Sequence, residues 1–348
     1  MFTNKLTNMV SVGNVKVGGG APLSVQTMWK KPFATDENII DQLKSLKDLG
    51  CDIIRFAVPD IDSAEILGVI AAESPMPVVA DIHFDYKIAL KCIDAGIHKI
   101  RINPGNIGAE WKVKEVIYKA KDKNIPIRVG VNSGSLPQKL RNNKDKAASM
   151  ILAAEEEIEI FEKYNFKNAL FSLKSPDVAT TISVNEMFAQ KYSYPLHVGV
   201  TEAGPLIDGV VKNSAALLHL LAKDIGSTVR VSLSSSPENE VIAGNAILSE
   251  AGKRDNVVNL VSCPKCGRAT FDVHEFVSKI YDKVKKIGKH LTISVMGCVV
   301  NGPQEAKDAD IGITGVGNSI VIFKKGEIFK KTTSQNAEEE FLREIEKL

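Results

Sequence analysis

The stretch PVVADIHFDYKIALKCIDAGIHKIRINP (77–104) contains two short apolar runs separated by an amphipathic segment. The runs PVVADIHF (77–84) and KIRINP (99–104) are rich in β-branched residues and predict strands, and the segment between them predicts a helix. Six further runs of the same kind are SVQTM (24–28), DIIRFAVP (52–59), PIRVGVN (126–132), NALFSLK (168–174), PLHVGVTE (195–202) and TVRVSLS (228–234). Eight strand and helix units in succession predict a (β/α)8 TIM barrel.

The competing α/β architecture is a doubly wound open sheet. It is disfavoured because no G-x-G-x-x-G follows the first strand. The amphipathic segments between the strands, such as 37–50 and 146–164, often end at a Gly or Asn, which are common residues just past the end of a helix. We therefore expect an α/β protein whose larger part is a closed barrel.

The pattern changes after residue 252. Two predicted strands, 256–262 and 291–297, flank a predicted helix at 271–288, and a hairpin-like segment and a charged terminal helix follow. The boundary falls in GKRDN (252–256). We predict a barrel domain over residues 1–254 and a smaller α+β domain over residues 255–348.

Composition narrows the class of protein. The 348 residues are 44% hydrophobic and 25% charged, and the formal net charge is only +2. Acidic and basic residues are interspersed, so we expect neither a nucleic-acid groove nor an anionic membrane face. The N-terminal residues lack the apolar segment of a signal peptide, and no window of about 18 apolar residues occurs. We expect a soluble, cytoplasmic protein whose five cysteines are metal ligands, redox groups or core residues rather than disulfides.

Arginine placement is informative because the chain has only 8 arginines beside 36 lysines. Four of the arginines lie inside predicted strands, where a soluble protein avoids unpaired charge. In a barrel these side chains reach the C-terminal mouth, and a ring of guanidinium groups there suits a ligand with several phosphate oxygens. The candidate ligand-binding residues are Arg55, Arg101, Arg128, Arg230, Asn103, Asn132, Lys174 and Ser232. The alternative is that the arginines form structural ion pairs with carboxylates such as Asp81 or Glu202.

Two strand ends carry further candidate residues. Asp81 and His83 have the i, i+2 spacing that puts two side chains on one face of a strand, and His83 is the ninth candidate ligand-binding residue. Glu202 ends the seventh predicted strand and is a candidate acid or base among the arginines.

The five cysteines fall into two groups. Cys51 and Cys92 occur where a small apolar residue would serve equally well, and we predict that they fill the core. The others, Cys263, Cys266 and Cys298, follow predicted strands separated by one helix, so parallel pairing would bring them together.

Three such cysteines predict a metal site. Zinc would need a fourth ligand such as His274 or His290, whereas an iron-sulfur cluster can leave one iron to a different ligand. Glu305 is the carboxylate best placed to fold back toward Cys298.

The chain resembles the 4-hydroxy-3-methylbut-2-en-1-yl diphosphate synthase family (IspG/GcpE) of the non-mevalonate isoprenoid pathway. The resemblance rests on motifs that occur in the same order along nearly the whole chain. They are VGNVKVGGGAPLSVQTM, VADIHFDYKIAL, RINPGNIG, IPIRVGVNSGSL, GVTEAG, VRVSLS, SCPKC and MGCVVNGP. The family implies a TIM barrel followed by an iron-sulfur domain, without the insert domain of the plant enzymes.

Residue by residue, the resemblance implies a 4Fe-4S cluster bound by Cys263, Cys266 and Cys298, with Glu305 as the unusual fourth ligand. It implies diphosphate binding by a set already selected from strand placement: Arg55, Arg101, Arg128, Asn132, Lys174, Arg230 and Ser232. Asp81 and Glu202 match polar residues that the family places near the substrate carbon skeleton and its hydroxyls. The predicted catalytic residues are Asp81, Glu202 and Glu305. This chain departs from the family in reading NGPQEA instead of NGPGEA, and in carrying WKKPFATD after the first strand.

The implied reaction is the reductive ring opening and dehydroxylation of 2-C-methyl-D-erythritol 2,4-cyclodiphosphate to (E)-4-hydroxy-3-methylbut-2-enyl diphosphate. Ferredoxin or flavodoxin would supply the two electrons, and the family implies a homodimer. Two alternatives remain from the residues themselves. One is a zinc-stabilised barrel that binds a phosphorylated ligand without redox chemistry, and the other is a pterin-type methyltransferase barrel with an accessory cluster.

Overall fold

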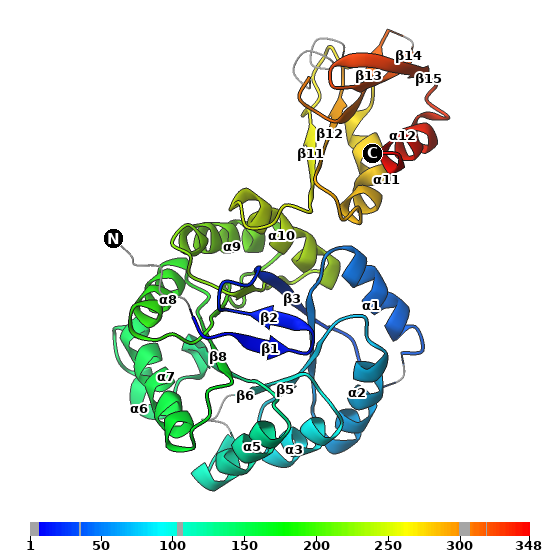
Figure 1. Cartoon of the computed structure of the whole chain (residues 1–348). Helices are drawn as coiled ribbons and strands as arrows, with labels where there is room; N and C mark the ends of the chain where they lie inside the picture. Colours follow the sequence, from blue (N-terminus) through cyan, green and yellow to red (C-terminus); the bar gives the residue numbers. More distant parts are fainter. Residues whose placement is uncertain (1–6, 35, 103–106, 299–306, 318) are drawn as a thin grey trace. The chain divides into compact units, whose positions relative to one another are not determined.

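The computed structural model describes residues 7–34, 36–102, 107–298, 307–317 and 319–348. The chain divides into two compact units, Met1–Arg254 and Asp255–Leu348. The first unit is a ring of helices around a parallel sheet (Figure 1), and the second is a small sheet with two helices. None of the helices in the described ranges has the length and apolar character that crossing a lipid bilayer requires.

Eight parallel strands form the barrel wall, in the order β8-β7-β6-β5-β4-β3-β10-β9. They are β3 (Ser24–Met28), β4 (Ile53–Ala57), β5 (Val78–Ile82), β6 (Lys99–Ile102), β7 (Ile127–Asn132), β8 (Ala169–Lys174), β9 (His197–Val198) and β10 (Thr228–Val229). A parallel bridge between Phe171 and Leu196 joins β8 to the segment that enters β9. The sheet is thus nearly closed, and the predicted (β/α)8 barrel is confirmed.

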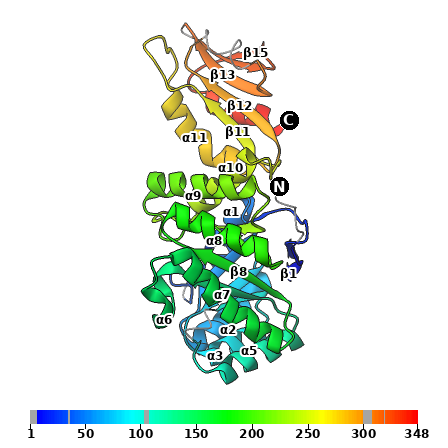
Figure 2. The ribbon, with the colours of Figure 1, turned by 90° about the vertical axis from the view of Figure 1, so that its left-hand side faces the viewer.

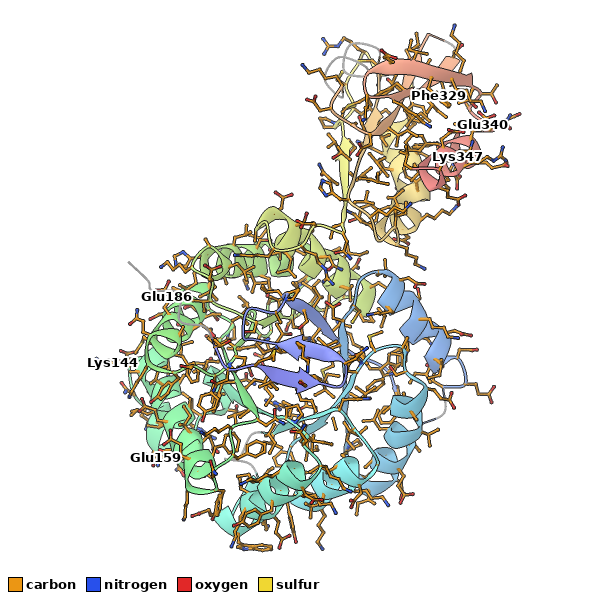
Figure 3. The ribbon with its side chains drawn as sticks, in the orientation of Figure 1. Lys144, Glu159, Glu186, Phe329, Glu340 and Lys347 are labelled. Atoms are coloured by element: carbon orange, nitrogen blue, oxygen red, sulfur yellow. The ribbon has the colours of Figure 1, made fainter. Side chains whose placement is uncertain are left out.

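The helices follow the strands and cover the outside of the barrel (Figures 1 and 2). They are α1 (Ile39–Asp48), α2 (Ile61–Glu73), α3 (Tyr86–Asp94), α5 (Glu110–Asp122), the short α6 (Gln138–Arg141) after the 3-10 turn Ser133–Ser135, α7 (Lys146–Lys163), α8 (Val178–Lys191), α9 (Leu206–Leu221) and α10 (Pro237–Glu250). Lys144, Glu159 and Glu186 mark the solvated outer surface in Figure 3.

Local chemistry fixes the helix ends. The side chains of Asp145 and Asp177 accept hydrogen bonds from backbone N–H groups in the first turns of α7 and α8. Asn124 and Asn165 follow α5 and α7 with φ values of 53° and 49°, a left-handed conformation that asparagine tolerates. The Gly and Asn residues noted in the sequence are therefore helix terminators.

A two-stranded hairpin that the sequence reasoning missed lies across the barrel in Figure 1. It consists of β1 (Val10–Val12) and β2 (Val15–Val17), which pair antiparallel. Val12 and Val17 are fully buried and pack against Ile53 and Val79, at the amino ends of β4 and β5. The hairpin therefore closes the end of the barrel opposite the mouth. Strands of three residues carry too short a pattern to be distinguished from a loop.

Cys51 and Cys92 are both fully buried in the main hydrophobic core. Burial raises the pKa of each thiol to about 12, so neither forms a thiolate at neutral pH. The prediction that these two cysteines fill the core is confirmed.

The interior of the barrel is polar beneath the mouth. Lys99 is fully buried on β6, and its Nζ donates a 3.1 Å hydrogen bond to Oε1 of Gln26 on β3. His197 on β9 is also fully buried, and its Nε2 has no hydrogen-bond partner in the described part of the chain. Burial lowers the pKa of Lys99 well below its usual value, and the nearby Arg128 and Arg55 lower it further.

The second unit is a five-stranded sheet in the order β11-β12-β13-β14-β15. Its elements are β11 (Val258–Ser262), α11 (Val273–Lys285), β12 (Leu291–Met296), β13 (Ile311–Val316), β14 (Ser319–Lys324), β15 (Glu327–Thr332) and α12 (Ala337–Glu346). The first three strands are parallel, and the last three form antiparallel pairs. Phe276 of α11 and Phe341 of α12 meet edge to face in its core, with ring centroids 5.7 Å apart. The α+β class predicted for this part of the chain is confirmed.

We expect Lys99→Met to stabilise the barrel in a pH-dependent way. The pKa of Lys99 is lowered in the folded state, so between the folded and unfolded pKa values the unfolded chain binds one proton more than the folded protein. The free energy of unfolding therefore rises with pH until the pH reaches about 10.4, the unfolded-state pKa of lysine. The variant lacks this dependence, so its advantage in melting temperature over the wild type should be largest near neutral pH and should shrink toward pH 10.

Differential scanning fluorimetry from pH 6 to 10 measures this advantage. Lys121→Met, at an exposed position on α5, is the control and should leave the pH dependence unchanged. A Lys99→Met advantage that stays constant over the whole range would contradict the expectation.

Candidate active site

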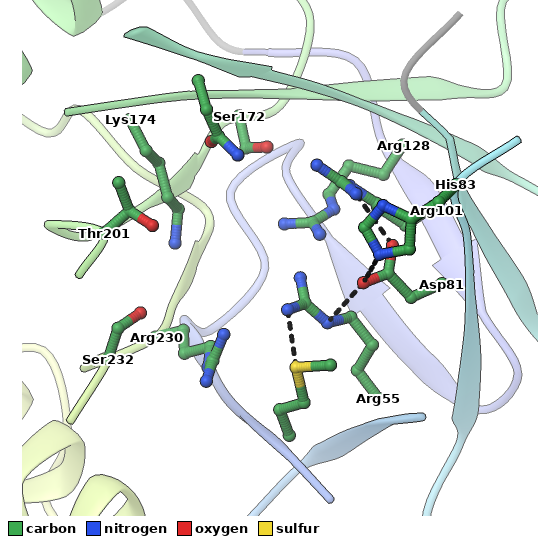
Figure 4. Close-up of a pocket in the computed structure, with 12 residues that line it drawn as sticks. Arg55, Asp81, His83, Arg101, Arg128, Ser172, Lys174, Thr201, Arg230 and Ser232 are labelled. Atoms are coloured by element: carbon green, nitrogen blue, oxygen red, sulfur yellow. Dashed lines mark hydrogen bonds and ion pairs between the residues drawn. The ribbon is translucent and has the colours of Figure 1, made fainter. Parts of the chain in front are cut away.

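One cavity opens at the carboxyl ends of the barrel strands, with a volume of about 230 Å³ (Figure 4). Successive side chains of a strand alternate between its two faces, so residues two apart enter the barrel together. The cavity is lined by Met28, Arg55, Asp81, His83, Arg101, Arg128, Asn132, Ser172, Lys174, Thr201, Arg230 and Ser232. It gathers eight of the nine residues that the sequence selected for ligand binding. The ninth, Asn103, lies outside the described residues.

Asp81 is the centre of one charged cluster in this cavity. Its Oδ1 accepts a 2.9 Å hydrogen bond from Arg101 Nη1, and its Oδ2 lies 3.6 Å from Arg55 Nε and 3.5 Å from His83 Nε2. Burial acts to raise the pKa of Asp81, but attraction to Arg55, the His83 hydrogen bond and Arg101 outweigh it and hold the pKa well below its usual range. Asp81 is therefore ionised and orients three cavity side chains.

A glycine makes room for one of these guanidinium groups. A Cβ atom on Gly130 of β7 would lie 2.7 Å from both Nε and Nη2 of Arg101. Any larger residue would push Arg101 away from Asp81. The glycine in PIRVGVN therefore shapes the cavity.

Arg230 belongs to a second charged cluster. Its Nε donates to Glu240 Oε2 at 3.1 Å and its Nη2 donates to Glu240 Oε1 at 3.2 Å. Glu240 lies on α10 and is only 1% exposed. The sequence reasoning missed it because a glutamate on an amphipathic helix is typical of a solvated face.

Arg128 and Lys174 differ from the other basic residues of the cavity. Both are nearly fully buried, and neither forms a salt bridge with a carboxylate in the part of the chain that the structure describes, unlike Arg101 and Arg230. Burial lowers the pKa of each well below its usual value, and neighbouring arginines lower it further. An arginine keeps its proton in proteins, so this repulsion is relieved when an anion binds beside Arg128.

The cavity as a whole carries an excess of positive charge. Within the part of the chain that the structure describes, five basic side chains, Arg55, Arg101, Arg128, Lys174 and Arg230, face two carboxylates, Asp81 and Glu240. The alternative of structural ion pairs thus holds for some of the arginines and fails for Arg128. An arrangement of this kind binds a ligand with more than one negative charge.

Three neutral side chains of the cavity were also missed. Met28 ends β3, and its Sδ lies 2.8 Å from Arg55 Nη2. Ser172 is two residues before Lys174 on β8, and Thr201 follows β9. The i, i+2 spacing to Lys174 was the signal that could have found Ser172.

Two predicted catalytic residues do not line the cavity in the described structure. Glu202 is exposed, and its backbone has a φ of 51°, an unfavourable conformation for a residue with a Cβ. Its neighbour Thr201 lines the cavity instead. Glu305 lies in 299–306, outside the described residues.

The cysteine motifs of the second unit lie at neighbouring strand ends. Parallel pairing of β11 with β12 sets Ser262 opposite Val295, so Cys263 follows one strand and Cys298 follows the other. The Gly297 N–H donates to Cys263 Sγ at 3.2 Å, and the Cys263 N–H donates to Val295 O at 3.1 Å. The predicted parallel pairing of the two strands is confirmed.

The cysteines differ in exposure: Cys266 is exposed, Cys263 is half-buried and Cys298 is buried. In the described ranges no three His, Cys, Asp or Glu side chains are close enough together to hold a metal ion. His290 Nδ1 lies 3.0 Å from Asp255 O, beyond the opposite ends of β11 and β12. It is therefore not a fourth ligand for these cysteines.

Two family models match the chain. The model described as the GcpE TIM-barrel domain matches residues 7–245, and the model of the GcpE protein C-terminal domain matches residues 259–347. Among solved structures, the dihydropteroate synthase of Yersinia pestis covers 70% of this chain and 97% of its own, at 11% identity and a TM-score of 0.49.

Two curated relatives match this chain over nearly their full length. Proteins named 4-hydroxy-3-methylbut-2-en-1-yl diphosphate synthase (flavodoxin) from Treponema denticola and Thermodesulfovibrio yellowstonii are 49% and 44% identical to this chain. Each alignment covers all of this chain, with 98% of the first relative and 100% of the second. The chain belongs to the GcpE family.

Proposed function

We propose that this chain is a 4-hydroxy-3-methylbut-2-en-1-yl diphosphate synthase that takes its electrons from flavodoxin. The main support is the cavity at the barrel mouth, whose excess of basic side chains matches a cyclic diphosphate. Both the relatives and the family models extend over the barrel and the second unit. Flavodoxin is preferred to ferredoxin because it stands in the relatives' names.

The proposed substrate is 2-C-methyl-D-erythritol 2,4-cyclodiphosphate. Its ring opens when one carbon–oxygen bond to phosphate breaks, and one hydroxyl leaves as water. The reaction consumes two electrons and two protons and yields (E)-4-hydroxy-3-methylbut-2-enyl diphosphate. The diphosphate stays attached at its other end, so the cavity must hold the same group before and after the reaction.

Arg128 and Lys174 are the proposed primary ligands of the diphosphate. They lack a carboxylate partner in the described structure, so binding the substrate relieves their mutual repulsion. Arg55, Arg101 and Arg230 each share a carboxylate and keep further N–H groups for phosphate oxygens. Asn132, Ser232, His83 and Asn103 complete the proposed substrate-binding set. Together these donors stabilise negative charge on the phosphate as the carbon–oxygen bond breaks.

Proton delivery is assigned to Glu202, which does not itself line the cavity but directly follows the cavity residue Thr201. Its strained backbone is the kind of conformation that persists at functional sites, and its exposure allows it to regain a proton from solvent. Asp81 is a poor proton donor because its pKa is held down by Arg55, His83 and Arg101 against the effect of burial. We assign Asp81 the task of fixing those three side chains around the substrate.

Cys263, Cys266, Cys298 and Glu305 are the proposed ligands of a 4Fe-4S cluster. Thiolates are the usual ligands of such clusters, and hydrogen bonds to the sulfurs tune their potentials, as the Gly297 N–H to Cys263 would do. When bound, the cluster supplies electrons one at a time and one iron that acts as a Lewis acid. Glu305 would hold the remaining iron through its carboxylate, which is a harder ligand than a thiolate.

The zinc-stabilised alternative has no support from the relatives, which carry the name of an enzyme.

We also propose a cytoplasmic homodimer. Its support is an apolar row on one face of α9, where Ile207, Val211 and Leu218 are 78%, 62% and 38% exposed. Sedimentation velocity tests the dimer, and a species of 37.8 kDa alone would contradict it.

The proposed activity is tested with anaerobically purified protein. It should be brown, contain iron and sulfide, and convert the cyclodiphosphate to the hydroxybutenyl diphosphate with reduced flavodoxin. A colourless protein that holds one zinc per chain and gives no turnover would rule the proposal out.

Arg128→Lys should weaken substrate binding, because a point charge replaces a planar group with two parallel donors. We expect the Michaelis constant to rise about tenfold or more, the scale of one lost hydrogen bond between charged groups, while the iron content stays unchanged. Arg141→Lys is the control, because Arg141 lies on α6 and binds the Leu136 carbonyl, away from the cavity lining. An unchanged Michaelis constant in Arg128→Lys would remove that residue from the site.

Cys298→Ala and Glu305→Ala should differ in their iron content. Loss of Cys298 leaves thiolates from only one strand end, so the cluster should be lost or reduced to a fragment. Glu305→Ala keeps three thiolates, which provide most of the affinity, so most of the iron should remain while turnover collapses. Iron and sulfide analysis together with turnover distinguishes the two. A fully active Glu305→Ala protein would exclude Glu305 as a ligand and make Asp308 or solvent the next candidate.

A further inference from the structure

The buried carboxylate of Glu240 binds groups from several elements at the mouth of the barrel. Its Oε1 accepts hydrogen bonds from Arg230 Nη2 at 3.2 Å and from the Leu233 N–H at 3.0 Å, and it lies 2.8 Å from Lys30 Nζ. Its Oε2 accepts from Arg230 Nε at 3.1 Å and from Thr27 Oγ1 at 2.7 Å. Glu240 lies on α10, and all of these partners lie outside that helix.

These partners come from two neighbouring strands and the segments that follow them. Thr27 is on β3 and Lys30 follows it, while Arg230 and Leu233 follow β10. Lys30 Nζ also donates to the carbonyls of Leu233 and Ser235, at 2.8 and 2.5 Å. β3 and β10 are the first and last strands of the barrel in chain order, and they pair. The Glu240 carboxylate thus fixes the mouth where the barrel closes on itself.

Two of the fixed groups belong to the cavity. Arg230 reaches into it in Figure 4, with Nε and Nη2 held by Glu240, so its other N–H groups remain for a ligand. Ser232, another cavity residue, immediately precedes Leu233, whose N–H is bound by Glu240. The hydrogen bonds to Glu240 therefore fix the direction of the Arg230 guanidinium group. They also fix the backbone next to Ser232, which carries a hydroxyl group into the cavity.

We propose that Glu240 is a positioning residue for the diphosphate: it aligns Arg230 and Ser232 with the phosphate oxygens without touching the substrate itself. This inference rests on the function proposed above. Burial acts to raise the pKa of Glu240, but Arg230, Lys30 and the Leu233 N–H lower it on balance, so the group is ionised at neutral pH.

A positioning role and a purely electrostatic role predict opposite effects. Removing a buried negative charge makes the cavity more positive, so Coulomb attraction alone would strengthen binding of an anion. A positioning role predicts weaker binding in spite of the added positive charge, because Arg230 and Ser232 lose their alignment. The sign of the change in affinity distinguishes the two roles.

Glu240→Gln is the first variant, because its NH2 group would face Arg230 as a donor facing a donor. Binding of 2-C-methyl-D-erythritol 2,4-cyclodiphosphate is measured by calorimetry on the full-length protein without reductant. We expect the dissociation constant to rise about tenfold, the effect of losing one charge-assisted hydrogen bond. The Michaelis constant should rise in parallel, and the iron content should not change.

Asp52→Asn is the matched control. Asp52 accepts a 2.8 Å hydrogen bond from the Val25 N–H of β3 and two 2.9 Å bonds from Arg254 Nη2, so it has similar partners but lies outside the cavity lining. This variant should lower the melting temperature without changing the dissociation constant. A purely structural role for Glu240 would make the two variants behave alike.

Glu240→Asp provides the second test and decides the matter if Glu240→Gln does not fold. It keeps the charge but is shorter by one methylene group, so it cannot reach Arg230 and the Leu233 N–H together. Binding should weaken several-fold at constant charge. A dissociation constant that stays at the wild-type value in Glu240→Asp, or that stays or falls in Glu240→Gln, overturns the positioning role. If the wild type does not bind the cyclodiphosphate, the proposed function fails instead.

Discussion

The burial of positive charge inside the barrel is the constraint on which the rest of the site depends. Five basic side chains converge on a cavity of about 230 Å³, and a buried cation without a partner is costly. Asp81 and Glu240 neutralise part of this charge and turn three arginines into oriented donors. Arg128 and Lys174 have no carboxylate partner in the described structure, so the cavity retains an affinity for anions that a fully paired network would lack.

The fold makes this arrangement rigid. Parallel strands present every second side chain to the interior, so the strand backbone fixes the position of each basic side chain along the barrel axis. Gly130 leaves the space that Arg101 occupies, and the hairpin of β1 and β2 closes the opposite end with Val12 and Val17. The side chains beneath the cavity are buried, and the low dielectric of a buried environment strengthens both the attraction to an anion and the repulsion among the cations.

In both units the candidate functional side chains lie at the carboxyl ends of parallel strands. In the barrel, charged side chains stand at the carboxyl ends of parallel strands, and in the second unit Cys263 and Cys298 follow the carboxyl ends of the parallel strands β11 and β12. The chain leaves a strand there without the constraint of pairing, so a loop can present several side chains or N–H groups to one point. The Gly297 N–H directed at Cys263 is an example.

The sequence by itself determined the barrel, the α+β second unit and most of the cavity, because strand periodicity and arginines inside apolar runs are local signals. It did not reveal the β1 and β2 hairpin, whose strands are too short to carry a pattern, and it set Glu202 in the cavity, whereas Thr201 lines it. Only the tertiary structure decided the partner of Arg230. Glu240 is ten residues further along the chain, in the first turn of α10, where an acidic residue is usually solvent-exposed and stabilises the helix N-terminus. Packing of α10 against β3 buries its carboxylate among five donor atoms, and no local pattern encodes a contact that depends on closing the barrel.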